Sequence, residues 1–187
     1  MAIEIELKAH VENYDELKLL LKEKAEYLYA FEKEDNYWKG ADLPKSGLRL
    51  RSEKRTHPDG TEESVALATY KFKEVREGIE VNDEREFSVD SAAQLENLLK
   101  LLALQPCNSK QKIGWAFTHK GITAELLEVK GLGWFLELEI TGINAADSNS
   151  NENFAEGKKR LLDFLDSLDI KREAIESRFY MEMLREN

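Results

Sequence analysis

The stretch Ile3-Glu4-Ile5-Glu6-Leu7-Lys8-Ala9 alternates strictly between apolar and charged side chains. A period of two predicts a β-strand with one apolar face and one charged face. Pairs of like charges two residues apart recur along the chain, and each pair shares one face of an expected strand. These pairs are Arg49 and Arg51, Lys71 and Lys73, Glu84 and Glu86, Lys110 and Lys112, and Glu137 and Glu139. The sequence therefore predicts several strands that each carry a strongly charged face.

The order of the expected elements favours an α+β protein in which strands dominate. The other strands are expected at 35–39, 47–52, 65–73, 110–117, 122–129 and 134–140. Helices are expected at 13–27, after a cap at Asp90 or Ser91 and before Pro106, and at 153–168 and 171–185. Most connections resemble hairpins, which indicates an antiparallel sheet, and many strands with few edges favour a closed barrel. We expect one domain spanning residues 1–187.

Composition limits the kinds of partner that the chain can have. Charged residues make up 34% of the 187 residues, and the net charge of −10 argues against nucleic acid as a bulk partner. A small phosphorylated ligand remains compatible, because local charge can oppose net charge. The chain shows neither a signal peptide nor an apolar run of the ~18 residues that a membrane span needs. We expect a soluble cytoplasmic protein without a membrane partner.

The same-sign pairs have two interpretations. For any one strand, a solvated sheet face is the more common explanation of alternating charge. Across several strands, repulsion between like charges at positions i and i+2 is costly, and a bound ligand with metal ions would offset it. Arginine and lysine bind phosphate oxygens, and paired carboxylates are hard ligands for Mg²⁺ or Mn²⁺. The pattern thus favours a polyphosphate site over a purely structural barrel.

Several motifs together resemble the CYTH superfamily of triphosphate tunnel enzymes. The opening Glu4-x-Glu6-x-Lys8 is similar to the N-terminal signature of that family. The stretch from Gly131 to Glu139 resembles its Gly-Leu-Gly-x-Phe-x-Glu-x-Glu segment. Further similar segments are Asp35-Asn36-Tyr37-Trp38, Leu48-Arg49-Leu50-Arg51, Thr69-Tyr70-Lys71, Lys110-x-Lys112 and Ser177-Arg178-Phe179-Tyr180. The resemblance covers nearly the whole chain.

The resemblance implies a closed eight-stranded antiparallel barrel, the triphosphate tunnel, with flanking helices. The metal ligands that it implies for Mg²⁺ or Mn²⁺ are Glu4, Glu6, Glu137 and Glu139. The triphosphate-binding residues that it implies are Lys8, Arg49, Arg51, Lys71, Lys110 and Lys112. The catalytic candidates are Lys8, Lys71 and Glu125, and Lys73, Glu84 and Glu86 are further site candidates.

One position departs from the family pattern. The family places an acid four residues before the first glycine of Gly-Leu-Gly, and this chain has Leu127 there. Glu125 lies on the same strand face and is the candidate to replace it. If nothing replaces the acid, an acidic residue at 127 is expected to raise turnover.

The leading functional hypothesis is a metal-dependent enzyme similar to class IV adenylyl cyclases, converting ATP to cyclic AMP and pyrophosphate. A triphosphatase acting on thiamine triphosphate or inorganic tripolyphosphate is the first alternative. A sensor that binds polyphosphate or nucleotide without turnover is the second. The expected partner is a small-molecule triphosphate, and a homodimer is left open as an assembly state.

Overall fold

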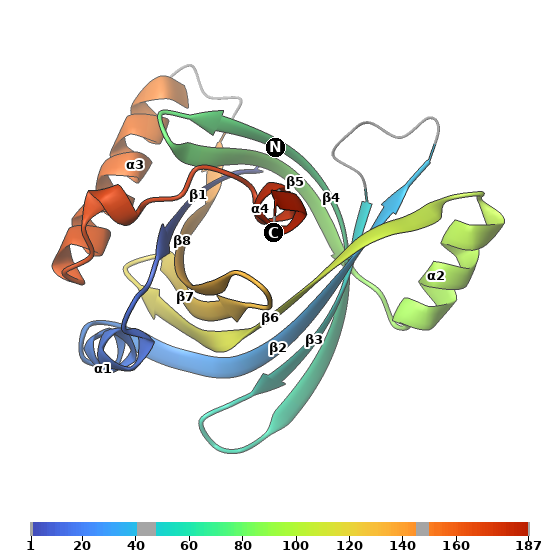
Figure 1. Ribbon diagram of the computed structural model, residues 1–187, viewed down its shortest axis with the longest axis horizontal. Helices are drawn as coiled ribbons and strands as arrows, with labels where there is room; N and C mark the ends of the chain where they lie inside the picture. The colour runs from blue at the N-terminus through green and yellow to red at the C-terminus, as the bar shows by residue number, and fades with distance from the viewer. Residues whose placement is uncertain (1, 41–47, 145–149, 187) are drawn as a thin grey trace.

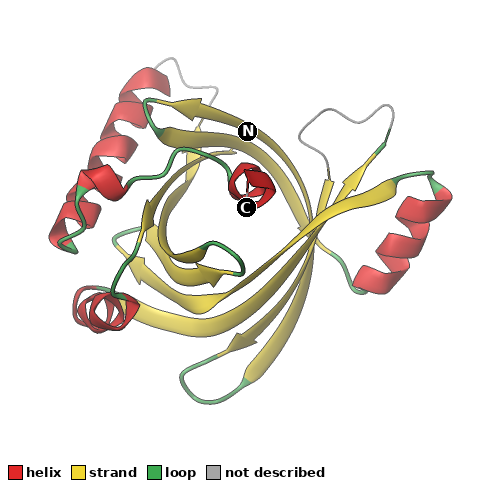
Figure 2. Cartoon of the chain, viewed as in Figure 1, coloured by secondary structure: helices red, strands yellow, loops and turns green. Residues whose placement is uncertain are grey.

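The computed structural model describes residues 2–40, 48–144 and 150–186. Eight strands form a closed barrel in the order β1-β5-β4-β3-β2-β6-β7-β8, and every neighbouring pair is antiparallel (Figures 1 and 2). The strands are β1 (Ala2–His10), β2 (Glu26–Lys39), β3 (Leu48–Thr56), β4 (Glu62–Arg76), β5 (Ile79–Ser88), β6 (Gln105–His119), β7 (Ile122–Val129) and β8 (Gly133–Asn144). The expected closed eight-stranded antiparallel barrel is confirmed.

Several strands are longer than the sequence indicated, and β2 shows why. The expected segment 35–39 is only the end of a strand that begins at Glu26. Glu32 and Glu34 are exposed, whereas Lys33 and Asp35 are buried inside the barrel. Because both faces of this strand carry charge, hydrophobicity does not alternate, and the period of two is hidden in the sequence.

The helices differ from expectation in two places. Helix α1 (Tyr14–Lys24) begins at its Asn13 cap as expected, and Ser91 rather than Asp90 caps α2 (Ala92–Leu101). Pro106 does not end α2, since the helix stops earlier and the proline lies within β6. Among the leucines of α2, Leu99 is buried, whereas Leu98 and Leu101 are exposed.

The expected C-terminal helix 171–185 is broken. Helix α3 (Ser150–Ser167) is followed by a 3₁₀ turn at Arg172–Ala174 and by the short helix α4 (Tyr180–Glu186). Between them the chain is extended, where Ile175 bridges to Ala9 and the Glu176 amide donates to the Lys8 carbonyl at 2.9 Å. Pairing with the barrel strand β1 therefore replaces helix in this segment. None of the helices among the described residues combines the length and apolar character needed to cross a bilayer.

The apolar faces of the strands point outward, toward the helices. Ile5 and Leu7 of β1 pack in one cluster with Leu21 of α1 and Leu161 and Leu165 of α3. A second outer cluster joins Trp38 and Leu50 to Leu99 of α2. Because successive side chains of a strand alternate between faces, the charged residues between these apolar ones point into the barrel. The interior of the barrel is therefore ionic, and its hydrophobic core lies outside it.

One end of the barrel interior is apolar. Phe31, Leu127 and Phe135 pack there against Tyr180 and Met183 of α4. Figure 1 shows α4 inside the ring of strands, whereas α1, α2 and α3 lie outside it. The C-terminal helix therefore fills one end of the tunnel.

Strands β6 and β7 approach each other closely at a glycine. Gly114 is paired with Leu127, and a Cβ atom at Gly114 would lie 2.3 Å from the Leu126 carbonyl oxygen and 2.8 Å from the Leu127 Cα.

Gly114→Ala is expected to lower the free energy of unfolding by about 1–3 kcal/mol or more, because backbone atoms must move. Urea denaturation checks this, with Ser64→Ala as a control, because Ser64 is an exposed residue of β4 and the change is expected to stay within about 0.5 kcal/mol. Equal stability of Gly114→Ala and the unchanged protein would contradict this account of the contact.

Candidate functional site: a charged tunnel

A cavity of about 290 Å³ inside the barrel is lined almost entirely by charged side chains. Seven glutamates and five basic residues line it together with Thr141 and Gly142. The glutamates are Glu4, Glu6, Glu84, Glu86, Glu125, Glu137 and Glu139, and the basic residues are Lys33, Arg49, Arg51, Lys71 and Lys112. A larger hollow of about 550 Å³ over β2, β3, β4 and β6 includes small neutral side chains such as Ser52, Ser64 and Ala66. The smaller cavity is the candidate site, because it concentrates the ionic groups.

Three carboxylates gather at one side of this cavity. Glu4 and Glu6 of β1 and Glu139 of β8 each place one carboxylate oxygen within 4.8 Å of the others. Glu6 and Glu139 are directly opposed in the β1–β8 ladder, so strand register brings them together. Burial and then the neighbouring carboxylates raise the pKa of Glu139 to about 9. Burial, partly offset by Lys71, raises the pKa of Glu4 to about 7.

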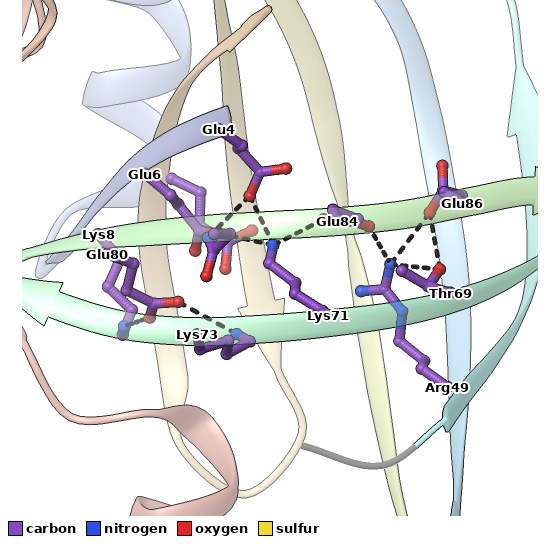
Figure 3. Close-up of polar contacts among 12 residues, drawn as sticks. Glu4, Glu6, Lys8, Arg49, Thr69, Lys71, Lys73, Glu80, Glu84 and Glu86 are labelled. Atoms are coloured by element: carbon purple, nitrogen blue, oxygen red, sulfur yellow. Dashed lines mark hydrogen bonds and ion pairs between the residues drawn. The ribbon is translucent and has the colours of Figure 1, made fainter. Parts of the chain in front are cut away.

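Lys71 is the cation at this cluster. Its Nζ contacts Glu4 and lies 3.6 Å from Glu6 and 3.0 Å from Glu84 (Figure 3). Burial opposes the charge of Lys71, yet these three glutamates hold its pKa well above the usual range. The raised pKa values of Glu4 and Glu139 indicate that negative charge is poorly offset at these two carboxylates, whereas Lys71, Lys73 and Lys8 outweigh burial and lower the pKa of Glu6. Three carboxylate oxygens with excess negative charge fit a hard divalent cation such as Mg²⁺ or Mn²⁺.

Two further glutamates of the cavity are paired with lysines. Both oxygens of Glu137 accept hydrogen bonds of 2.8 Å from Lys112 Nζ. Burial raises the pKa of Glu137, but the charge of Lys112 outweighs burial, so the pKa is lowered. The expected role of Glu137 as a metal ligand stays a prediction. In this structure its carboxylate is bound by Lys112. Glu125, a catalytic candidate, forms an ion pair with Lys33.

Two arginines of β3 lie across the barrel from β1 and β8, the strands that carry the acidic cluster. Arg49 donates to Thr69 at 3.0 Å and to Glu84 and Glu86 at 3.2 Å each (Figure 3). Arg51 binds the carboxylate of Asp35 with two hydrogen bonds of 2.6 Å and 3.0 Å. Arg49 is thus held by carboxylates of β5, two strands away, and Arg51 by a carboxylate of the adjacent strand β2.

Three of the predicted basic residues lie outside the cavity lining. Lys8 and Lys73 both pair with Glu80 of β5, and Lys73 does so at 3.1 Å. Lys110 lies 3.4 Å from Asp35. These lysines continue the charged wall toward the end of the barrel that holds α4. Their roles as phosphate ligands stay predictions.

Sequence reasoning missed several charged residues of the interior. Lys33 and Glu80 were not singled out, and Asp35 and Tyr180 were quoted only as parts of motifs. Lys33 and Asp35 carry the right parity on β2, but the charges on the other face of that strand mask it. Glu80 lies on the same face of β5 as the predicted Glu84 and Glu86, so strand parity was the available signal.

Leu127 does not face the acidic cluster. Its side chain is fully buried in the apolar end of the barrel, packed with Phe135, Tyr180 and Met183. Leu127, which stands where the family has an acid, therefore packs against α4.

Comparison with known proteins agrees with this geometry. The CYTH domain family matches residues 2–180. The chain belongs to the CYTH family. A Methanocaldococcus jannaschii protein named "Putative adenylate cyclase" is 26% identical, with 97% of this chain and 98% of that protein covered.

Solved CYTH-like structures have the same barrel. The PH1012 protein of Pyrococcus horikoshii superposes with a TM-score of 0.73 at 28% identity, covering 96% of this chain and 98% of that one. A Hippeastrum protein, described as a "Putative adenylyl cyclase" that reveals a dominant triphosphatase activity, superposes with a TM-score of 0.59 at 16% identity, covering 100% of this chain and 96% of that one. CYTH proteins in general depend on metal ions, and the Glu4, Glu6 and Glu139 cluster supplies the matching acidic groups.

The Asp35–Arg51 pair gives a pH-dependent prediction. Asp35 is fully buried, and although burial opposes ionisation, Arg51 and Lys110 hold its pKa well below the usual 3.8. Asp35→Asn is expected to cost about 3 kcal/mol or more at pH 7, because it leaves a buried arginine without its counter-ion. A depressed pKa stabilises the fold above the unfolded pKa, so the difference should be constant above about pH 5 and shrink below pH 4.

Chemical denaturation of the two proteins from pH 3 to pH 8 measures this difference. Asp83→Asn is the matched control, because Asp83 forms an exposed pair with Arg85 at 3.2 Å and should contribute little. A difference for Asp35→Asn that is small or independent of pH would refute the assigned pair.

The position of Leu127 reverses the expectation from the family pattern. Leu127→Asp is expected to lower the free energy of unfolding by at least about 3 kcal/mol, because it places a carboxylate among apolar side chains. Leu127→Met keeps the volume and should cost less than about 1.5 kcal/mol. Thermal melts combined with turnover measurements decide the matter, and a stable Leu127→Asp protein with raised turnover would overturn it.

Proposed function

We propose that this CYTH protein is a metal-dependent enzyme that acts on the triphosphate group of a nucleoside or organic substrate inside the barrel. The observation that carries the proposal is the meeting of two kinds of group in one cavity. An acidic cluster suited to a divalent cation shares that cavity with Arg49, Arg51, Lys33 and Lys112. A triphosphate with its metal ion needs both kinds of group.

The ion pairs of the cavity indicate how such a ligand would bind. Glu4, Glu6 and Glu139 would hold the metal ion, which supplies positive charge to phosphate oxygens. Arg49 would exchange Glu84 and Glu86 for phosphate oxygens at little cost in charge, because one anion replaces another. Arg51 keeps its bidentate partner Asp35, which orients the guanidinium toward the cavity.

The proposed site is shared by two reactions. In the cyclase reaction, the ribose 3′-hydroxyl of ATP attacks the α-phosphorus and pyrophosphate leaves. In the triphosphatase reaction, a water attacks a phosphorus of thiamine triphosphate or tripolyphosphate. The group held in line with the bond to the leaving phosphate decides between them. Both names occur among the related proteins, so both reactions belong to the proposal.

A product assay tests the proposal. The purified protein is incubated with ATP, thiamine triphosphate or tripolyphosphate, each with Mg²⁺ or Mn²⁺. Cyclic AMP identifies a cyclase, orthophosphate without cyclic AMP a triphosphatase, and binding without any product would leave only a sensor. Absence of both binding and turnover with every compound would refute a triphosphate site.

Glu139 provides the sharpest variant for this assay. Glu139→Gln is expected to lower metal-dependent kcat by at least about a hundredfold, because the amide keeps the size of the side chain but loses a hard anionic ligand. Glu128→Gln changes a glutamate outside the cavity lining on the adjacent strand β7, and it should retain normal turnover. Normal turnover in Glu139→Gln would remove Glu139 from the proposed metal site.

A further inference from the structure

Two phenylalanines on the outer surface of the barrel are exposed to solvent. Phe72 of β4 has 57% of its surface exposed, and Phe87 of β5 has 59%. Phe72 follows Lys71 and Phe87 follows Glu86, and both of these charged residues line the cavity. Because side chains alternate along a strand, the two rings lie on the outside of the barrel, on the reverse of the candidate site.

The strand register joins the two rings into one surface. In the β4–β5 ladder, Phe72 is opposite Asp83 and Tyr70 is opposite Arg85, and Phe87 is two residues further along β5. These five side chains form the outer β4–β5 face. Grouped apolar side chains of this size on a surface, bordered by polar residues, are typical of a contact with another protein.

Helices cover the outward apolar side chains on both sides of this face. Ile79 and Val81 of β5 are buried in the cluster that contains Leu161 of α3. On the other side, Leu50 of β3 is buried in the cluster that contains Leu99 of α2. Figure 1 shows β4 and β5 crossing the barrel between α3 and α2, and none of the helices in the described part of the chain lies over their middle. The outer β4–β5 face is therefore left uncovered by the described chain.

The charges of this face identify the partner that fits it. Asp83 and Arg85 form an exposed ion pair of 3.2 Å along β5, so opposite charges lie side by side. A two-fold axis that passes between them would set Asp83 against Arg85 of a second copy, and Arg85 against Asp83 of that copy. The face is thus complementary to itself. A partner with charges of one sign would match only one of the two residues.

We propose that the outer β4–β5 face is the contact surface of a symmetric dimer of this protein. Burial of Phe72 and Phe87 supplies most of the affinity, because exposed ion pairs contribute little energy. The two charges set the orientation, because like charges would meet in other arrangements. Lys71 and Glu84 point away from this contact into the cavity, so the dimer leaves the candidate site free. The inference does not depend on the proposed function.

Sedimentation equilibrium over about 1 to 200 μM protein measures the dissociation constant of the dimer. The unchanged protein should approach twice the chain mass of 21.5 kDa as its concentration rises. Phe72→Ser should raise the dissociation constant at least about tenfold, because the variant loses a ring that the contact buries. Leu19→Ser is the matched control, because Leu19 of α1 is 64% exposed and lies outside the face. It should change the constant by less than about twofold.

An exchange of charges tests the two-fold arrangement. Arg85→Asp leaves two acidic side chains on the face, and Asp83→Arg leaves two basic ones. Each variant alone should dimerise at least about tenfold more weakly, because like charges meet across the axis. An equimolar mixture of the two variants should form dimers as the unchanged protein does, because an acidic face then meets a basic one. Thermal melts should show both variants folded, since the ion pair that they change is exposed.

Three outcomes would overturn the proposal. The first is an unchanged protein that stays monomeric at every concentration, which would leave the face to a different protein. The second is a dimer that Phe72→Ser weakens no more than Leu19→Ser does, since its contact would then lie elsewhere. The third is a mixture of folded Arg85→Asp and Asp83→Arg proteins that forms no dimer, which would refute the symmetric contact.

Discussion

The architecture depends on charge balance inside a barrel. An isolated buried charge is strongly destabilising, whereas a buried pair with hydrogen bonds is tolerated. Most ionic side chains of the interior have such a pair, as Asp35 has with Arg51 and Glu137 with Lys112. The exception is the group of Glu4, Glu6 and Glu139, where the pKa values of Glu4 and Glu139 are raised although Lys71 lies beside the cluster. The site is defined by this local imbalance.

The same balance holds an arginine of the cavity in place before any ligand binds. Arg49 is held by Thr69, Glu84 and Glu86, so it is ordered before any ligand arrives. In the proposed function, a ligand that brings both phosphate oxygens and a divalent cation would supply an anion to Arg49 and a cation to the acidic cluster. A simple anion or a simple cation would satisfy only one side, which favours a metal-bound polyphosphate over either alone.

The outward-facing core makes this interior possible. Ile5 and Leu7 pack against α1 and α3 instead of filling the barrel, and Trp38 packs beneath α2. Hydrophobic burial therefore stabilises the fold without occupying the tunnel. At the one end where apolar residues do enter the barrel, Leu127 and Phe135 receive α4, and the tunnel is closed there.

The sequence by itself determined the barrel and most of its charged lining. Strict alternation in β1 and the same-sign pairs on later strands fix which side chains share a face, because the strand period is two whatever the surroundings. Alternation failed where both faces are charged, as in β2, and so Lys33 was overlooked.

Residues far apart in sequence are brought together only by strand register, which placed Glu139 beside Glu6 and Lys112 beside Glu137. The break in the expected 171–185 helix, and the entry of Tyr180 into the tunnel, arise from pairing with β1 and from the apolar end of the barrel. Local sequence carries no record of those contacts, so only the tertiary structure decided them.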